Sequence, residues 1–426
     1  MNKLGRLHMH DRNRAIRNRR YRFEILFRFA GIAAICVALS MLLLIMVSII
    51  TAGSTGFLRT DISLEVDLTE VPADLTPEQR YQINWLGISR AALRQHFPEV
   101  TTRSERKKLY KLLSSGAGYE LQAMVEDRPE LAGTVRRVKL PASSDVDLLL
   151  KGKIDRTVDA SLRTLDDQQI GWVDQLDAKA LLETRFNWQF FVKGDSRLPE
   201  LAGIWGGIVG SFWMLLITLV ISLPLGLLTS VYLEEYAKPG RWMRLIETNI
   251  NNLAAVPSIV FGLLGLVLFL NIADMPRSAP ITGALVLTLM TLPTIVIAAR
   301  AALSAIPPSI REAAYGLGAS RTQVVLHHLI PLSLPGTLTG TIIGMAQALG
   351  ETAPLLMIGM VAFILEPSFS PVEASTALPV QIFLWADNPE RGFVEKTSAA
   401  IMVLILFLIL MNMAALLLRR KTRKNW

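Results

Sequence analysis

The stretch Arg311-Glu312-Ala313-Ala314-Tyr315-Gly316-Leu317-Gly318-Ala319-Ser320 decides how this chain is interpreted, because it is short and polar and stands between two long apolar runs. Pro307 and Pro308 end whatever helix precedes it, since proline cannot continue a helix. Gly318 stands where a turn between two short helices requires a positive φ. We call residues 307–324 the elbow.

Each half of the elbow carries a helix-start signal. Ser309 with Glu312, and Ser320 with Gln323, follow the Ser-x-x-Glu/Gln pattern of a capping box. The pattern predicts two small helices that meet at an angle on a membrane surface, with small residues near the corner. Such an object suits docking into a groove on another protein.

Apolar runs of spanning length place most of the chain in a membrane. The 426 residues are 51% hydrophobic, and a bilayer crossing needs about 20 mainly apolar residues. Six runs reach that length, which predicts an all-α polytopic membrane protein with six transmembrane helices. They are roughly Phe29–Ile50, Ile208–Leu233, Leu253–Ile272, Ile281–Ala302, Leu338–Ile364 and Ala399–Leu418.

The net charge of +8 is concentrated beside these runs. Nine Lys and Arg residues lie in the first 28 positions, and another cluster occupies residues 419–424. Positive charge flanks the cytoplasmic ends of spans, so both termini and the elbow are expected inside the cell, as six spans require. This placement favours contact with the membrane over nucleic-acid binding.

Residues 54–203, which we call the polar domain, separate the first run from the second. They hold 21 basic and 23 acidic residues, unlike the basic flanks, and topology places them outside the membrane. We expect a mainly helical α+β domain. Helices are predicted after a capping box at Thr76-Pro77-Glu78-Gln79 through His96, and over Arg103–Leu113 and Ser161–Glu183, with a strand over Thr134–Leu140.

Several kinds of chemistry have no pattern in the sequence. The single cysteine, Cys36, lies in the first run, which is too long for a cleaved signal and is expected to stay as an anchor. The five histidines show no metal spacing, and no catalytic grouping or cofactor motif is found. Gly152-Lys153 lacks the rest of a P-loop, so ATP hydrolysis is expected from a separate subunit.

Two features of the spans suggest helix packing and a passage. Small residues recur every fourth position in the fifth span, which predicts close approach of a helix from this chain or from another subunit. They are Gly336, Gly340, Gly344, Ala348 and Thr352. Val256-Pro257-Ser258 breaks the third span, which suits a gate or pore lining, or only a structural kink. Asn251 and Asn252 before it face water or cap the helix.

Glu351 is expected inside the fifth span, where a carboxylate is costly and is a functional hypothesis by default. Four roles stand: pairing with an arginine in the passage, carrying a proton, locking the helices in one state, or a structural ion pair only.

The elbow resembles the EAA loop of ABC importer permeases, which engages the ATPase subunits. Glu312, Ala313, Ala314 and Gly318 fit that motif, as does Pro331, whereas His328 and Ile330 depart from it. The stretches Leu253–Leu263 and Gly350–Leu356 narrow the resemblance to permease subunits of phosphate ABC importers, in a long variant with a large periplasmic insertion.

The resemblance covers about residues 204–426 and implies a subunit that translocates phosphate across the bacterial inner membrane. A second permease subunit, an ATP-binding cassette ATPase dimer and a periplasmic phosphate-binding protein would be its partners. The domains would be 1–53, with the tail and first span; 54–203, the polar domain; and 204–420, the permease core. The polar domain would dock the binding protein or act as a spacer.

The resemblance also implies a translocation path. Its candidate residues are Asn251, Pro257, Ser258, Thr294, Gln347, Glu351 and Thr352. Relatives often carry arginines where this chain has Gln347 and Ile297, so arginines that contact phosphate would come from the sister subunit. Two alternatives remain: a permease for another oxyanion such as sulfate or molybdate, and a membrane-anchored sensor. The sensor lacks a cytoplasmic output module of useful length.

Overall fold

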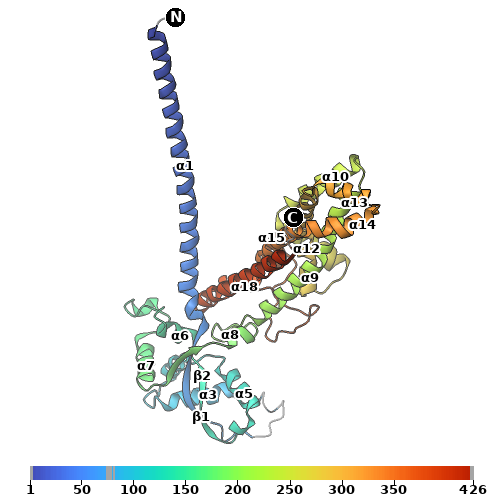
Figure 1. The fold of residues 1–426 in the computed structure, drawn as a ribbon. Coiled ribbons are helices and arrows are strands. Elements are labelled where there is room, and N and C mark those ends of the chain that lie inside the picture. The colour runs from blue at the N-terminus through green and yellow to red at the C-terminus, as the bar shows by residue number, and fades with distance from the viewer. Residues whose placement is uncertain (1–2, 73–78, 80–81, 423–426) are drawn as a thin grey trace. The chain divides into compact units, whose positions relative to one another are not determined.

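The computed structural model describes residues 3–72, 79 and 82–422 and divides into two compact units, Met1–Ala52 and Gly53–Trp426. The first unit consists of most of helix α1, which covers Lys3–Gly53 (Figure 1). Across the described residues, five helices are long and apolar enough to cross a membrane, or six if one bent pair counts as a span. The predicted polytopic helical fold is confirmed.

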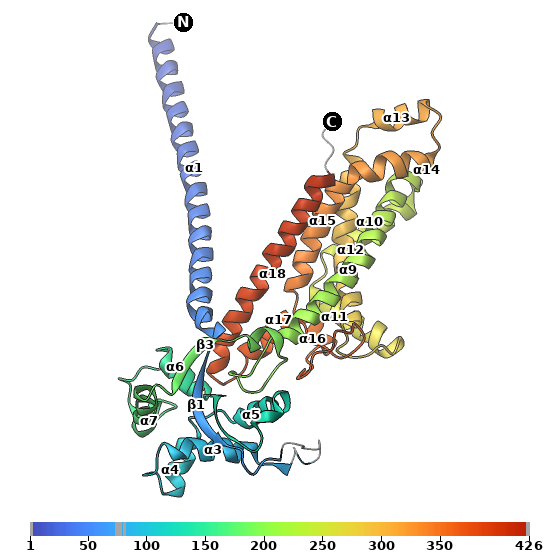
Figure 2. The same cartoon turned by 60° about the horizontal axis from the view of Figure 1, so that its bottom comes forward.

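The second unit contains four long helices, each of which packs against the next one along the chain (Figure 2). They are α9 (Trp205–Val231), α12 (Pro280–Ser304), α15 (Ile330–Gly350) and α18 (Gly392–Thr422). Buried hydroxyl groups join α9 to α12. The Thr218 hydroxyl donates to the Ala284 carbonyl at 3.1 Å, and Ser230 donates to the Val296 carbonyl at 3.0 Å. These bonds satisfy two buried hydroxyl groups at the contact between the helices.

The third predicted span is a broken one. Helix α10 covers Arg241–Ala254, and α11 (Ser258–Gly265) continues as a π-helical segment to Ile272. The two helices meet at 104°. The sequence places Pro257 at this break, and a proline without an N–H group disfavours helix in the residue before it.

The predicted fifth span, Leu338–Ile364, is wrong at both ends. The helical segment runs over 30 residues, Arg321–Gly350, and stops there. The short helix α16 (Ala353–Met357) follows, then an irregular stretch and helix α17 (Leu378–Ala386), which the hydropathy pattern does not reveal. Pro354 lies in the first turn of α16, where its missing N–H is tolerated, so it starts a new helix instead of continuing α15.

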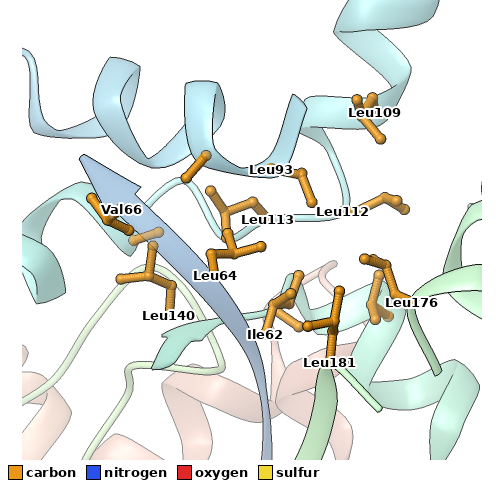
Figure 3. Packing of buried hydrophobic residues seen from close by; sticks show 14 of the residues in the cluster. Ile62, Leu64, Val66, Leu93, Leu109, Leu112, Leu113, Leu140, Leu176 and Leu181 are labelled. Atoms are coloured by element: carbon orange, nitrogen blue, oxygen red, sulfur yellow. The ribbon is translucent and has the colours of Figure 1, made fainter. Parts of the chain in front are cut away.

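The polar domain is built on a three-stranded antiparallel sheet in the order β2-β1-β3. The strands are β1 (Leu58–Asp67), β2 (Val135–Pro141) and β3 (Leu182–Phe186). Ile62, Leu64 and Val66 of the central strand are fully buried at alternate positions, so they share one face. Helices cover that face, and their leucines complete the core (Figure 3).

The helices of the polar domain are short. They are α3 (Trp85–Gln95), α4 (Arg103–Tyr110), α5 (Ala117–Asp127), α6 (Ser144–Leu150), α7 (Asp167–Ala178) and α8 (Gln189–Val192). The predicted helix from Arg103 and the strand from Thr134 are confirmed with slightly shifted ends. The capping box at Thr76 lies outside the described residues.

The predicted helix Ser161–Glu183 is wrong at both ends. Helix α7 begins at Asp167, capped by Asp166, and ends at Ala178. Ala180 adopts a φ of 51°, which no right-handed helix allows, and β3 begins at Leu182. The pairing of β3 with β1 overrides the local helical pattern there.

A buried ion network fastens the polar domain to the start of α18. The Lys151 ammonium bonds Asp147 at 2.5 Å, Glu395 of α18 at 2.6 Å and the Leu58 carbonyl at 2.9 Å. The ion-paired side chains are at most 6% exposed. Lys396 adds a bond to the Gly56 carbonyl at 2.7 Å. Because the buried Lys151 ammonium is paired with a carboxylate on each side, this part of the polar domain is held to the last span.

Glu200 is a second buried acid of the polar domain. The pKa of its carboxyl group is raised from an ordinary 4.5 to about 7, mainly by burial and to a smaller extent by the carboxylates of Glu390 and Asp147, while the hydrogen bond with Ser114 lowers it. Between pH 4.5 and about pH 7, the Glu200 carboxyl group therefore keeps its proton in the folded state and has lost it in the unfolded state. The contribution of Glu200 to the stability of the fold is greatest below pH 4.5 and decreases as the pH rises toward 7.

Glu200→Gln should remove this loss of stability. At pH 8 we expect the variant to exceed the parent protein in unfolding free energy by up to about 3 kcal/mol, and at pH 4.5 to match it. Thermal unfolding of the purified chain in detergent, followed from pH 4.5 to 8, measures the effect. Glu130→Gln, at an exposed position, is the control. Parallel curves for parent and Glu200→Gln would refute the assignment.

The small-residue ridge of α15 packs against α12 of the same chain. A methyl group added to Gly340 would lie 2.1 Å from the Ala298 methyl, and one added to Gly336 would lie 2.5 Å from that of Ala302. The interpretation as close packing within one subunit therefore accounts for these glycines. Thr352 lies beyond the end of α15 and is not part of the ridge.

Candidate functional site

The elbow forms two helical pieces, as the sequence predicts, but they begin differently. Helix α13 covers Pro308–Gly316 and is preceded by Pro307, without a side-chain cap, so the capping box at Ser309 is wrong. Pro308 has the fixed φ that suits a first helical residue, and it starts the helix before Ser309 can cap it. The second box, Ser320 with Gln323, is confirmed, and Gly318 has the predicted positive φ, 85°.

The second half of the elbow is not a separate small helix. Helix α14 (Arg321–Val324) passes through a π-helical turn, Val325–Leu329, into α15 without a break. The second half of the elbow is therefore continuous with a helix that is long and apolar enough to span a membrane. Figure 2 shows α13 beyond the end of the bundle where α14 meets the spans.

Arg311 anchors α13 to two spans. Its guanidinium donates to the Glu235 carboxylate at 3.0 Å, to the Ile306 carbonyl at 2.9 Å and to the Leu303 carbonyl at 3.1 Å. Glu235 belongs to a π-helical turn, Tyr232–Tyr236, that ends α9, and Leu303 lies in the last turn of α12. A cation there also suits the carbonyl groups left free at a helix C-terminus. The contact ties the elbow to α9 and α12.

Arg300 forms a second link between helices. Its Nε bonds Glu234 at 2.8 Å, and its Nη2 bonds Glu247 of α10 at 2.6 Å. Both carboxylates neutralise the guanidinium, so Arg300 serves as a structural tie between α12, α10 and the end of α9. Sequence reasoning missed the partners because they lie 53 and 66 residues away.

The outward side of the elbow is apolar and exposed. Ala314 is buried against the ends of the spans, whereas Glu312 and Ala313 are exposed. Leu317 is 90% exposed and Tyr315 is 44% exposed. Leu317 and Tyr315 are thus large apolar side chains that this part of the elbow exposes to solvent. The sequence alone does not show that these two side chains are exposed.

The two breaks in the spans lie close together. Helix α16, after the break at Glu351-Thr352, packs on α11, after the break at Pro257. Gly262 makes the approach possible, because an added methyl group would lie 2.6 Å from Cα of Pro354. The predicted path residues lie in three segments, around Pro257, Thr294 and Glu351. The structure brings the first and the third of these segments together.

Glu351 lies outside the helical part of the fifth span, contrary to the prediction. It follows the last residue of α15 and is half-buried. Its side chain has no hydrogen bond or ion pair with any described residue, and the same holds for the exposed side chains of Asn251 and Gln347. Thr294 and Ser258 are half-buried and Pro257 is exposed. These polar groups are available to water, an anion or another subunit.

No group of three or more His, Cys, Asp and Glu residues that could hold a metal ion occurs in the described part of the chain.

Residues 222–424 match the family model described as the binding-protein-dependent transport system inner membrane component. The phosphate transport system permease protein PstA 1 of Mycobacterium tuberculosis is 33% identical over 225 residues, which cover 52% of this chain and 73% of that protein. The chain belongs to this family of transport components. PstA of Mycobacterium leprae is 31% identical over 226 residues, with the same two coverages.

The solved structure of the MetNI methionine ABC transporter in inward-facing conformations is 21% identical to this permease, with a TM-score of 0.42. It covers 52% of this chain and 95% of the solved chain. Residues 14–160 of the permease match a domain of unknown function, DUF3333. The permease match begins after the polar domain and includes the elbow and both breaks.

Proposed function

We propose that this multi-pass membrane protein is the permease subunit that carries inorganic phosphate across the bacterial cytoplasmic membrane, with both termini inside. The observation that carries the proposal is the 33% identity over 225 residues to a phosphate transport system permease. A second permease subunit completes the path, and a periplasmic phosphate-binding protein delivers the ion. A separate ATPase dimer hydrolyses ATP.

In this proposal the elbow is the coupling element, with Glu312, Ala313, Ala314 and Gly318 in contact with the ATPase. The exposed Leu317 and Tyr315 extend that contact. When the ATPase subunits close, force on α13 passes through Arg311 to the ends of α9 and α12. It passes through the continuous helix of α14 and α15 to the break at Glu351. The span ends then move together, which alternating access requires.

The path residues lie around the two breaks and on the neighbouring helices. Asn251, Pro257 and Ser258 flank the first break, and Glu351 and Thr352 form the second. Thr294 and Gln347 offer neutral donors, which bind an anion without holding it tightly. Breaks suit this role because they leave backbone groups free to face a water-filled path. Arginines that contact phosphate come from the second permease subunit.

Uptake measurements test the substrate. In a strain without other phosphate importers, deletion of this chain should reduce uptake of labelled phosphate at least about tenfold, and the intact chain should restore it. Unlabelled phosphate should compete, whereas sulfate and molybdate should not. Uptake that persists after deletion would refute the proposal, and stronger competition by sulfate or molybdate would assign the permease to that oxyanion instead.

A further inference from the structure

The polar domain holds a large pocket that the transport mechanism does not use. Its volume is about 720 Å³, and its walls come from α3, α4, the start of α6 and the segments around Leu198 and Glu390. A pocket of this size suits a small organic or oligomeric ligand. Most of its charged lining is basic.

One face of helix α4, together with Lys111 directly after its last residue, supplies most of the positive charge. Arg103, Arg106, Lys107 and Lys111 all line the pocket. Their spacing of three, four and eight residues from Arg103 puts them on one side of the helix. Lys108 and Leu109 point elsewhere, since Lys108 pairs with Asp166 at 2.8 Å and Leu109 is fully buried in the core.

These cations have no anionic partner within the described chain. No ion pair between described residues engages Arg103, Lys107 or Lys111, although three carboxyl groups line the same pocket. Arg90 joins the cationic wall from α3 and stacks over the Tyr110 ring at 5.4 Å. Its Nε is buried and lacks a hydrogen-bond partner. The basic wall is therefore open for an anion that comes from outside the chain.

The pocket is also lined by three acidic residues, Asp145, Glu200 and Glu390. Glu390 accepts a hydrogen bond from the Ser144 hydroxyl at 2.9 Å. Glu200 is 4% exposed, and its Oε2 has no partner. A buried oxygen without a partner is costly, and it can be satisfied by the hydroxyl group of a protonated phosphate. A ligand that carries both negative oxygens and P–OH groups suits both the cations and this oxygen.

The cationic row is too long for a single orthophosphate ion. From Arg103 to Lys111 the helix advances by about 12 Å. Linked phosphate groups can contact successive cations along that length, and each charged hydrogen bond adds about 1.5–3 kcal/mol. We propose that this pocket binds a soluble anion with two or more linked phosphate groups, of the short-chain polyphosphate class. The site is separate from the transport path and does not depend on the proposed function.

Calorimetric titration of the full chain in phosphatidylcholine nanodiscs at fixed salt tests the proposal. The probes are orthophosphate, pyrophosphate, tripolyphosphate and sulfate. We expect tripolyphosphate to bind about tenfold or more tighter than orthophosphate, since it reaches more of the cations. Arg103→Gln with Lys107→Gln should weaken tripolyphosphate binding about tenfold or more, because two charged contacts are lost.

The control removes two positive charges from another exposed part of the same domain, with Arg136→Gln and Arg137→Gln on β2. It should leave binding within about twofold of the parent, since these positions lie outside the pocket. Thermal unfolding establishes that both double variants fold. Equal binding by the two double variants would overturn the proposal, as would tripolyphosphate binding no tighter than orthophosphate.

The same cations could meet the phosphate group of a lipid, and nanodisc composition separates the two sources. Tripolyphosphate should bind in discs of phosphatidylcholine alone. If no soluble anion binds, and Arg103→Gln with Lys107→Gln alters only the association with phosphatidylglycerol, the soluble-ligand proposal is wrong and the pocket faces anionic lipid.

Discussion

Ala313→Asp will detach the ATPase from the permease and reduce phosphate uptake at least about tenfold. Ala313 is exposed on α13, so the new carboxylate is solvated in the isolated chain and leaves the fold intact. In the proposed complex it would be buried without a partner, at a cost of several kcal/mol. Each 1.4 kcal/mol or so corresponds to a tenfold change in affinity.

Co-purification of the ATPase with the tagged permease, together with uptake of labelled phosphate, measures this effect. Ala91→Asp is the matched control, because Ala91 is an exposed alanine within α3 of the polar domain. The control should keep both the ATPase and uptake. If Ala313→Asp behaves like Ala91→Asp, the elbow does not bind the ATPase through α13, and the coupling proposal fails.

Lys151→Met will destabilise the protein by about 3–5 kcal/mol, because it leaves the buried carboxylates of Asp147 and Glu395 without their cation. The distances are 2.5 and 2.6 Å, and the three ionic side chains are nearly inaccessible to solvent. The Leu58 carbonyl also loses its donor. Because Glu395 belongs to α18, the polar domain should loosen from the last span before the spans separate.

Thermal unfolding in detergent gives the stability of the whole chain, and limited proteolysis of the polar domain tests the local loosening. Lys139→Met is the control, since Lys139 pairs with Glu183 at 2.5 Å but both side chains are about half exposed. An exposed pair contributes about 1 kcal/mol at most. Adding Glu395→Gln to Lys151→Met should recover part of the loss. Equal stabilities of the Lys151 and Lys139 variants would contradict the network's importance.

The polar domain and the elbow are connected to different spans. Lys151 and Lys396 connect the polar domain to the first turns of α18, while the elbow is connected to α9, α12 and α15. Glu390, which lines the basic pocket, lies two residues before α18 begins.

The structure confirms several sequence predictions that depend only on neighbouring residues. Gly318 adopts a positive φ because the turn between two short helices requires it, and Ser320 caps α14 with its own Gln323. Pro257 breaks the third span because its ring leaves no N–H group for a helical hydrogen bond and disfavours helix in the preceding residue. The capping box at Ser309 failed because Pro308 competed for the helix start, a local conflict that the pattern alone does not resolve.

The sequence by itself determined which segments are apolar enough to span a membrane and that the chain turns at Pro257 and Gly318, because hydropathy and backbone preference belong to contiguous residues. Only the tertiary structure decided that Gly340 meets Ala298, that Arg311 is held by Glu235, and that Lys151 binds an acid 244 residues away. It also showed that Arg103 and Lys107 of α4 form no ion pair with any described residue. Partners of charged and small residues come from distant segments, and the free energy of such contacts exists only after the helices have packed.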